Sequence, residues 1–347
     1  MDHRERGPAV TGAASLKTAI ERFAGKTILV LGDLIADEYV YGKPARISRE
    51  APVLILRYDS REVRLGGAAN ASHNIHTIGG RVIPVGVVGK DTAGDEILAL
   101  FRSLGISTDG ILRIADRPTP VKTRIMAGGY QSTRQQVVRV DREPPAFLDP
   151  VVEESLLAAV TAEGGRADAI LLSDYGYGTV TSKLLDAALA LSRGNGSLVT
   201  ADSRYDLLKF RGVSAATPNE PEMEEIVGFP LTDGPALEKA GRQILDRLGA
   251  RYLLVTRGSR GMALFERDGP SMFLPIYGSD EIADVTGAGD VVISTFTLAL
   301  AAGATPVDAA GLANVAGGLK VMKRGTAPIT RAELLQALER HGPPREP

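Results

Sequence analysis

Short apolar runs recur along the chain, and most of them are separated by segments with the periodicity of amphipathic helices. The runs cover residues 27–33, 82–88, 169–173, 197–201, 215–217 and 252–256. Continuous apolar runs of this length are typical of parallel strands that are buried on both faces. Strands that alternate with helices predict right-handed crossovers and a sheet covered by helices on both sides. The pattern therefore predicts an α/β core with a mostly parallel sheet.

Two stretches interrupt this rhythm, residues 38–65 and residues 120–141. Their polar and apolar residues alternate with a period nearer two, which is typical of antiparallel strands with one face in water. Ligands of open α/β folds bind at the carboxyl edge of the sheet, so these strands are predicted to form a small β lid over that edge. The alternative is a solvent-exposed hairpin with no moving part.

Composition and the chain ends narrow the range of partners. Forty Lys and Arg residues against forty-two Asp and Glu residues give a net charge of −2, and there is no basic block, so neither nucleic acid nor a membrane is an expected partner. A small-molecule substrate fits better. Residues 1–24 lack the apolar core of a signal peptide and are predicted to form a flexible arm, while residues 343–347 form a tail. The apolar stretches are too short to span a membrane.

Cysteine and histidine usage removes further classes of chemistry. The chain has no Cys, which excludes disulfides, thiolate nucleophiles and Cys-ligated zinc and is compatible with the cytoplasmic location that we predict. Of the four His residues, His73 and His76 could share a helix face, but a third ligand is missing, so no metal site is predicted there.

The segment 284–290, Asp-Val-Thr-Gly-Ala-Gly-Asp, precedes an apolar stretch that predicts a buried helix over residues 291–302. Residues 287–290 would form its first turn, where unpaired amides and the helix dipole attract anions and the glycines let a phosphate approach the backbone. Asp290 would stand beside the phosphate and could accept the proton of an attacking hydroxyl. Alternatively, the segment is only a loop before an acidic helical turn.

Residues 66–70, Gly-Gly-Ala-Ala-Asn, form a second Gly-rich helix entrance. Asn70 could bind sugar hydroxyls, although helix capping explains the pattern almost as well. Asp33 and Asp37 follow the first predicted strand. They could accept hydrogen bonds from a polyol, or they could cap a turn.

Two further motifs follow predicted strands. Asn219 and Glu222 match a helix capping box, and the same pair could hold, through water, the magnesium that accompanies a nucleotide triphosphate. Residues 256–261 could contact nucleotide phosphates or ribose, or form a plain hairpin turn. The sequence contains no G-x-x-x-x-G-K-[ST], and no G-x-G-x-x-G follows the first strand, which argues against P-loop and dinucleotide-binding proteins.

Together, residues 66–70 and 284–290 resemble the two signatures of the ribokinase-like (PfkB) carbohydrate kinase family, in the same order and separation. The resemblance runs from about residue 27 to residue 338 and includes the Asn219-x-x-Glu222 motif. It implies a ribokinase-like three-layer α/β/α core with a β lid, a kinase domain over residues 25–342, and an ATP-dependent sugar kinase that uses Mg²⁺. K⁺ is a candidate second cofactor.

Within that family, the chain looks like the kinases that phosphorylate D-glycero-β-D-manno-heptose 7-phosphate at O1. The residues that carry this likeness are Gly32, Asp33, Asp37, Tyr39, Tyr41, Gly42, Arg46, Ile47, Ser48, Glu50, Ala51, Pro52, Val53, Thr119, Lys122, Arg124, Gln135, Gln136, Arg139, Asp141, Ser173, Asp174 and Tyr175. In bacteria this reaction is a step towards ADP-heptose for lipopolysaccharide. A nucleotidyltransferase domain follows the kinase in many relatives, whereas this chain ends at Pro347 and resembles the single-function form.

The resemblance assigns expected roles to individual residues. Asp290 would be the base, while the amides of Gly287, Ala288 and Gly289 would stabilise the transferring phosphoryl group. The candidates for sugar binding are Asp33, Asp37, Gly67 and Asn70, with Lys122, Arg124 and Arg139 for the sugar phosphate. The candidates for the nucleotide are Asn219, Thr256, Gly258, Gly261 and Asn314. Asn219 and Glu222 would organise Mg²⁺ through water, and Asp284 and Thr286 are candidates for binding a monovalent cation.

Several positions depart from the heptose kinase pattern. Glu38 replaces a usual Arg, Tyr177 replaces a usual Lys, and Ser203-Arg204 replaces Pro-Lys. Lost positive charge should weaken binding of a phosphorylated sugar unless Arg204 or Arg257 compensates. The rival hypotheses are a family kinase for another sugar or sugar phosphate, a non-catalytic sugar or nucleotide sensor and, most distantly, a nicotinamide dehydrogenase. Exposed edges of the lid could pair in a homodimer.

Overall fold

A nine-stranded sheet forms the centre of the molecule in the computed structural model, which describes residues 10–128, 134–278 and 284–342. Its strand order is β13-β12-β11-β10-β9-β8-β1-β4-β5, and the pairs from β5 to β11 are parallel. The strands are β1 Thr27–Gly32, β4 Arg81–Gly89, β5 Ile111–Ile114, β8 Ala169–Asp174, β9 Leu198–Ser203, β10 Ala215–Ala216, β11 Tyr252–Thr256, β12 Met262–Glu266 and β13 Met272–Leu274. The six predicted strands and the α/β fold are confirmed, whereas β5 and the antiparallel edge strands β12 and β13 were not predicted.

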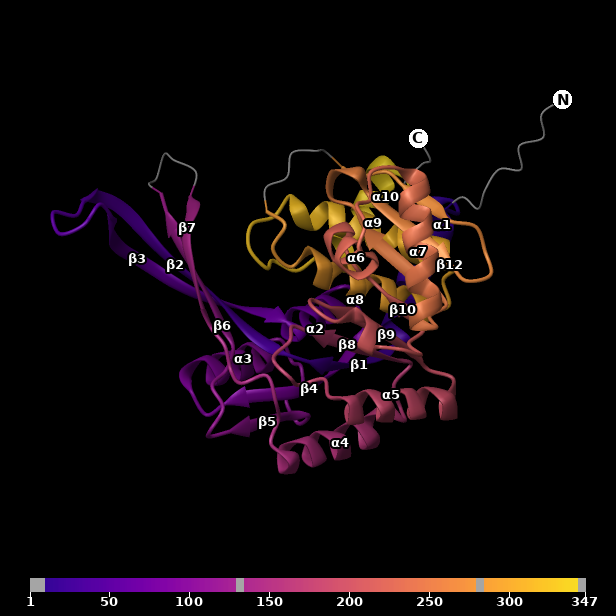
Figure 1. The fold of residues 1–347 in the computed structure, drawn as a ribbon, viewed down its shortest axis with the longest axis horizontal. Coiled ribbons are helices and arrows are strands. Elements are labelled where there is room, and N and C mark those ends of the chain that lie inside the picture. The colour runs from indigo at the N-terminus through magenta and orange to yellow at the C-terminus, as the bar shows by residue number, and fades with distance from the viewer. Residues whose placement is uncertain (1–9, 129–133, 279–283, 343–347) are drawn as a thin grey trace.

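Helices cover both faces of this sheet (Figure 1). They are α1 Ala13–Glu21, α2 Ala68–Thr77, α3 Thr92–Ser103, α4 Pro150–Gly164, α5 Ser182–Asn195, α6 Glu220–Val227, α7 Gly234–Leu248, α8 Ala288–Ala301, α9 Pro306–Val321 and α10 Arg331–His341, with short 3₁₀ turns at Arg22–Gly25, Leu207–Lys209 and Gly258–Arg260. Along β1, Ile28 and Val30 join one apolar cluster with α1, α2, α3, α8, α9 and α10, while Leu29 and Leu31 join the cluster with α4, α5, α6 and α7. The alternation produces the three-layer core.

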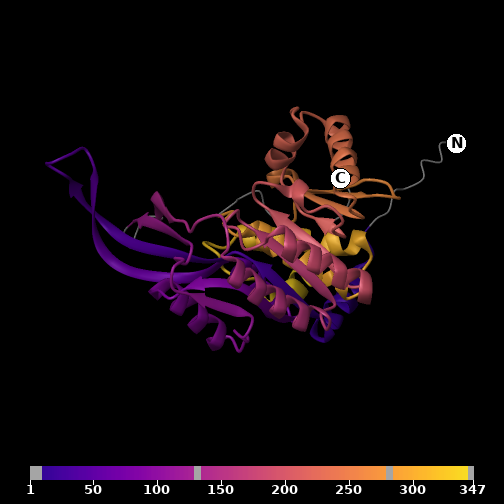
Figure 2. The same ribbon diagram turned by 60° about the horizontal axis from the view of Figure 1, so that its bottom comes forward.

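The predicted lid is a separate four-stranded sheet. Its strands are β2 Leu34–Ile47, β3 Leu54–Gly67, β6 Val121–Ala127 and β7 Gln135–Arg142, in the order β3-β2-β6-β7. The hairpins β2–β3 and β6–β7 are antiparallel as expected, but β2 and β6 pair in parallel. Strands β2 and β6 are parallel because both begin at the core and run outwards from it. The long β2–β3 hairpin projects from the core in both views (Figures 1 and 2).

The expectation of a loose arm over residues 1–24 is wrong for its second half. Residues 13–25 form α1 and a 3₁₀ turn, in which Leu16, Ile20 and Phe23 are fully buried. Their spacing of four and three residues places them on one helical face, which packs in the same apolar cluster as α10. Residues 1–9 and the tail at 343–347 lie outside the described residues. No helix in the described ranges is both long enough and apolar enough to span a bilayer.

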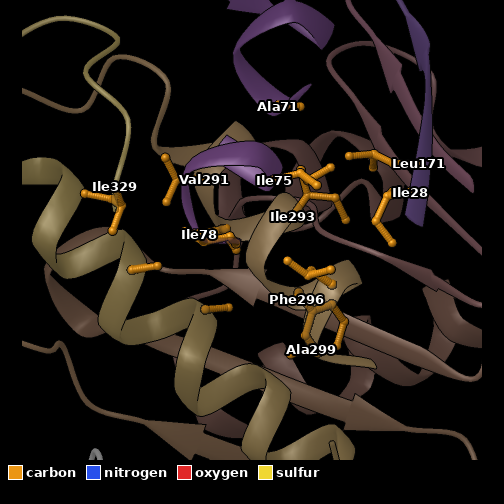
Figure 3. Packing of buried hydrophobic residues seen from close by; sticks show 14 of the residues in the cluster. Ile28, Ala71, Ile75, Ile78, Leu171, Val291, Ile293, Phe296, Ala299 and Ile329 are labelled. Atoms are coloured by element: carbon orange, nitrogen blue, oxygen red, sulfur yellow. The ribbon is translucent and has the colours of Figure 1, made fainter. Parts of the chain in front are cut away.

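Helices α2 and α8 differ from most other helices in how they begin. Helices α3 to α7, α9 and α10 each start at an Asp, Asn or Thr whose side chain accepts a backbone hydrogen bond. In contrast, α2 and α8 start at Gly67 and Gly287, without such a cap. Their bodies pack together, and Figure 3 shows Ile75 of α2 near Ile293 and Phe296 of α8. This packing brings both uncapped helix starts to one place.

Candidate active site

A cavity of about 780 Å³ lies at the carboxyl edge of the main sheet, beside the lid. Asp174, Asp202 and Thr256 at the ends of β8, β9 and β11 line it, together with Lys122 and Arg124 of the lid strand β6. The first turn of α8 completes its wall. The fold thus places the predicted Gly-rich turn and the lid around one space, as expected for an open α/β sheet.

Asp290 lies in the first turn of α8, with only 2% of its surface exposed. The Asn70 side-chain amide donates to its Oδ2 at 2.7 Å, and the Tyr175 hydroxyl donates to its Oδ1 at 2.8 Å. Burial raises the pKa of Asp290 to about 6, while these two hydrogen bonds oppose the rise. A carboxylate with this pKa is mostly ionised at neutral pH and can still accept a proton, which suits a general base.

The backbone requires a glycine at position 287 before Asp290. Gly287 has φ of 74°, and a Cβ at this position would lie 2.7 Å from the side-chain nitrogen of Asn70. The amide of Ala288 donates to the carbonyl of Val285 at 3.1 Å, so the structure commits this amide to a turn. Of the three amides expected to hold the transferring phosphoryl group, the tight turn before α8 therefore uses the middle one, and the amides of Gly287 and Gly289 stay the candidates.

The capping box at Asn219 and Glu222 is confirmed. The Asn219 side chain accepts from the Glu222 amide at 2.9 Å, and Glu222 Oε2 accepts from the Asn219 amide at 3.0 Å. Both residues also line the cavity, and burial raises the pKa of Glu222. Glu222 therefore caps helix α6 and at the same time presents its carboxylate to the cavity.

Asp202 was not predicted as a site residue. It lines the cavity near the end of β9, and its Oδ1 accepts from the Thr217 hydroxyl at 3.2 Å. Burial, with the nearby charges of Asp290 and Glu222, raises the pKa of Asp202 to about 8. The sequence feature that could have identified Asp202 is its position directly after the apolar run 197–201. The same rule, a carboxylate at the end of a predicted strand, selected Asp33. Within the described ranges, no cluster of three His, Asp or Glu residues is arranged to hold a metal ion by itself.

The lid side of the cavity contains the predicted sugar-binding charges. Asp37 is buried and pairs with the guanidinium of Arg124, while Arg139 pairs with Asp141 at 2.9 Å. The Lys122 ammonium lies 4.8 Å from the centre of the Tyr175 ring, as expected for a cation–π contact. Gly67 also lines the cavity. Because Asp37 neutralises Arg124, Lys122 is the stronger candidate for a substrate phosphate.

The structure corrects the expected contact of Asp33 with a substrate. Asp33 does not line the cavity, and its carboxylate accepts from the amides of Tyr175, Tyr177 and Thr179 at 2.8, 3.1 and 3.2 Å. It follows β1 as predicted, but it folds back onto the loop after β8. Asn70 is likewise fully buried against Asp290 and is not among the cavity-lining residues. Both side chains position other groups.

The far end of the cavity contains the predicted nucleotide residues. Thr256, Gly258, Gly261 and Asn314 line it, together with the apolar side chains of Met262, Ile276, Val292 and Val321. The hairpin alternative is confirmed, because Gly258–Arg260 is a 3₁₀ turn between the antiparallel strands β11 and β12. At Gly261, φ is 81° and a Cβ would lie 2.0 Å from the Leu274 carbonyl, so only glycine fits. This end suits a flat ring beside polar groups.

The predicted cation ligands lie beside the start of α8. The Asp284 carboxylate accepts from the amides of Thr286 and Gly325 at 2.9 and 2.7 Å, which ties the loop before α8 to the loop after α9. Thr286 also lines the cavity. The side chain of Lys320 reaches the same place, and burial lowers its pKa to about 8 while Asp284 raises it. The amine is thus mainly protonated at neutral pH.

This fold and site define a ribokinase-like kinase, and residues 26–332 match the pfkB family carbohydrate kinase. The chain belongs to this family and is a phosphotransferase with an alcohol group as acceptor. A bifunctional protein HldE from Pelobacter propionicus is 38% identical over 325 residues, which cover 93% of this chain and 65% of that relative. The chain therefore spans slightly less than two thirds of its length.

Solved structures show the same fold. Ribokinase from Arabidopsis thaliana, complexed with ribose and ATP, has a TM-score of 0.69 at 20% identity and covers 90% of this chain and 98% of its own. Phosphofructokinase-2 from Escherichia coli, in complex with substrates and products, has a TM-score of 0.75 at 17% identity with the same coverage. The predicted ribokinase-like architecture is confirmed.

Proposed function

We propose that the chain transfers the γ-phosphoryl group of ATP to O1 of D-glycero-β-D-manno-heptose 7-phosphate, which gives the 1,7-bisphosphate. The observation that carries the kinase mechanism is the buried Asp290, held by Asn70 and Tyr175 beside the uncapped start of α8. The similarity to the HldE proteins, together with the charges around Lys122, supports the heptose phosphate as acceptor.

In the proposed reaction, the acceptor hydroxyl lies between Asp290 and the phosphate held at the start of α8. Asp290 takes the hydroxyl proton as the oxygen attacks the γ-phosphorus, the bond to the β-phosphate oxygen breaks, and ADP leaves. The amides of Gly287 and Gly289 stabilise the charge on the transferring group. The Tyr175 and Asn70 donors keep the Asp290 carboxylate oriented towards the cavity.

Magnesium fits the proposed site. Glu222 and Asp202 present carboxylates with raised pKa values to one cavity, and such carboxylates favour a cation between them. Mg²⁺ prefers oxygen ligands and keeps several waters, so Glu222 and Asn219 would hold it through water with Asp202 nearby. When bound, it would neutralise charge on the nucleotide phosphates.

A second acceptor from the same class, a different sugar phosphate, is favoured by one feature of the cavity wall. Tyr177 lines the cavity where a Lys is usual, and its hydroxyl donates to Glu143 at 3.2 Å. By contrast, Glu38 binds Thr123 and Arg61 and does not line the cavity. The departure at Tyr177 therefore bears on acceptor choice, whereas the departure at Glu38 does not.

We also propose that a second copy of the chain pairs with the lid. Strand β7 is an edge of the lid sheet and exposes Val137, Val138 and Val140. An apolar edge strand of this kind is a ready template for strand pairing, and a symmetric partner would cover it.

The test of the acceptor measures ADP release with the heptose 7-phosphate, fructose 6-phosphate, ribose and adenosine. A larger kcat/KM for the heptose 7-phosphate supports the proposal, and a much larger value for another acceptor contradicts it. The same assay with Asp290→Asn tests the mechanism, because loss of the base should lower turnover by a factor on the order of 10² or more. Normal turnover of this variant would show that Asp290 is not the base.

A further inference from the structure

Lys320 near the C-terminal end of α9 is a fully buried lysine, with 0% of its surface exposed. Its ammonium lies 3.5 Å from the carbonyl oxygen of Asp284 and 3.4 Å from the carbonyl oxygen of Lys323. A buried ammonium is costly unless oxygen dipoles or carboxylates compensate it. The fold therefore builds a cation position from its own carbonyls, next to the loop that leads into the active site.

The two carbonyls come from the two loops that the Asp284 side chain holds together. One loop precedes α8, and the other follows α9 and includes Gly325, whose amide donates to Asp284. This is the place where Asp284 and Thr286 were expected to bind a monovalent cation. The Asp284 carboxylate is instead used by two amides, and its carbonyl already has a cationic neighbour.

A potassium ion does not fit this arrangement. Proteins bind K⁺ with backbone carbonyl oxygens that replace its hydration shell. Here the Lys320 ammonium approaches the same kind of oxygens, and it brings a unit positive charge with three N–H donors. A metal ion placed among these carbonyls would lie against a fixed like charge, and the repulsion would be strong because the position is buried.

We propose that the Lys320 ammonium takes the place of a monovalent cation, so that phosphoryl transfer by this chain is independent of K⁺. The positive charge of Lys320 acts on the loop that ends at Gly287 and on Asp290 in the first turn of α8. Negative charge develops in this region during phosphoryl transfer. The electrostatic influence of Lys320 extends to Asp290. A positive charge that is covalently fixed stabilises that region without the need to recruit an ion.

The first test compares the native chain in KCl with the native chain in tetramethylammonium chloride at equal ionic strength. We expect kcat/KM to agree within about twofold, because the charge is already present. The comparison can use any acceptor that the enzyme phosphorylates, so it does not depend on the heptose assignment. A native enzyme that needs K⁺ for most of its activity would overturn the proposal.

Three variants test the position itself. Lys320→Ala removes the charge and leaves room for an ion, so kcat/KM should fall on the order of tenfold without K⁺ and recover when K⁺ is added. Lys320→Met removes the charge but fills a similar volume, so its loss should not be restored by K⁺. The matched control is Lys26→Ala, because that ammonium binds the Asp168 carboxylate at 2.8 Å, neither residue lines the cavity, and its loss should change kcat/KM little.

Thermal unfolding gives a readout that needs no substrate. An ion that binds only the folded state raises Tm, so K⁺ should raise the Tm of Lys320→Ala and leave that of the native chain unchanged relative to tetramethylammonium. If K⁺ raised the Tm of the native chain as much as that of Lys320→Ala, the proposal would be overturned. If Lys320→Ala does not fold, the native chain's Tm and activity in the two salts still decide between the outcomes.

Discussion

The hydrogen bond from the Tyr175 hydroxyl to Asp290 predicts a shift in the pH dependence of catalysis. Tyr175→Phe keeps the ring beside Lys122 but removes the donor that lies 2.8 Å from the carboxylate. A hydrogen bond to a charged group contributes about 1.5–3 kcal/mol, and one pKa unit corresponds to about 1.4 kcal/mol. Because this donor stabilises the ionised form, its loss should raise the pKa of Asp290 from about 6 to about 7–8.

The consequence is a loss of activity at neutral pH that alkaline pH reverses. At pH 7 the ionised fraction of Asp290 should fall from about nine tenths to between about one tenth and one half, so kcat/KM should drop about two- to tenfold. The assay is the pH profile of kcat/KM, in which the acid limb should move to higher pH. Any titration of the substrate phosphate is common to both enzymes, so the difference reports on Asp290.

The control for this experiment is Tyr177→Phe in the same loop, whose hydroxyl contacts Glu143 and not Asp290. Its acid limb should stay at the native position. An unmoved limb in Tyr175→Phe, or a limb that moves to lower pH, would show that this hydrogen bond does not set the pKa of the base.

Three further predictions follow from the site and the lid. Lys122→Ala should raise KM for a phosphorylated sugar more than for an unphosphorylated one, and equal effects would remove Lys122 from phosphate recognition. Asp33→Ala leaves three loop amides without their acceptor and should lower the free energy of unfolding by about 1–3 kcal/mol or more in a denaturant titration, whereas an unchanged midpoint would contradict that role. The native chain should have a dimeric mass in solution, Val138→Lys should shift it towards monomer, and a monomeric native chain would refute the lid pairing.

Sequence patterns predicted the core best where one local rule is sufficient. Apolar runs such as residues 27–33 have few alternatives to a buried strand, and β1 appears where it was expected. Helix α1 was missed because it offers only Leu16 and Ile20 as large apolar residues, with Phe23 in the 3₁₀ turn that follows, and its stability comes from packing into the core rather than from composition. The parallel pairing of β2 with β6 was missed because register between distant strands is a tertiary property.

The sequence predicted a site residue best where the backbone conformation at that position and the proposed function require the same residue type. Gly287 must be a glycine both to form the turn and to let Asn70 approach, so this part of the motif is visible in the sequence. Asp202 and Tyr175 have no comparable backbone requirement. The strand end places Asp202 at the right edge of the sheet, but only the fold shows that both residues reach the cavity. Asp33 shows what a strand end does not predict. It indicates the edge of the sheet at which a side chain lies, but not the partner that the side chain binds.

The loop after β8 links acceptor choice to catalysis. Asp33 holds this loop by its amides, Tyr175 presents its hydroxyl to Asp290, and Tyr177 forms part of the cavity wall. The Lys122 ammonium lies over both rings, 4.8 Å from the first and 5.9 Å from the second. An acceptor whose phosphate draws Lys122 away from these rings would therefore also perturb the donor that sets the pKa of Asp290. Acceptors that bind this wall differently should consequently differ in kcat as well as in KM, because the wall and the base are positioned by the same few residues.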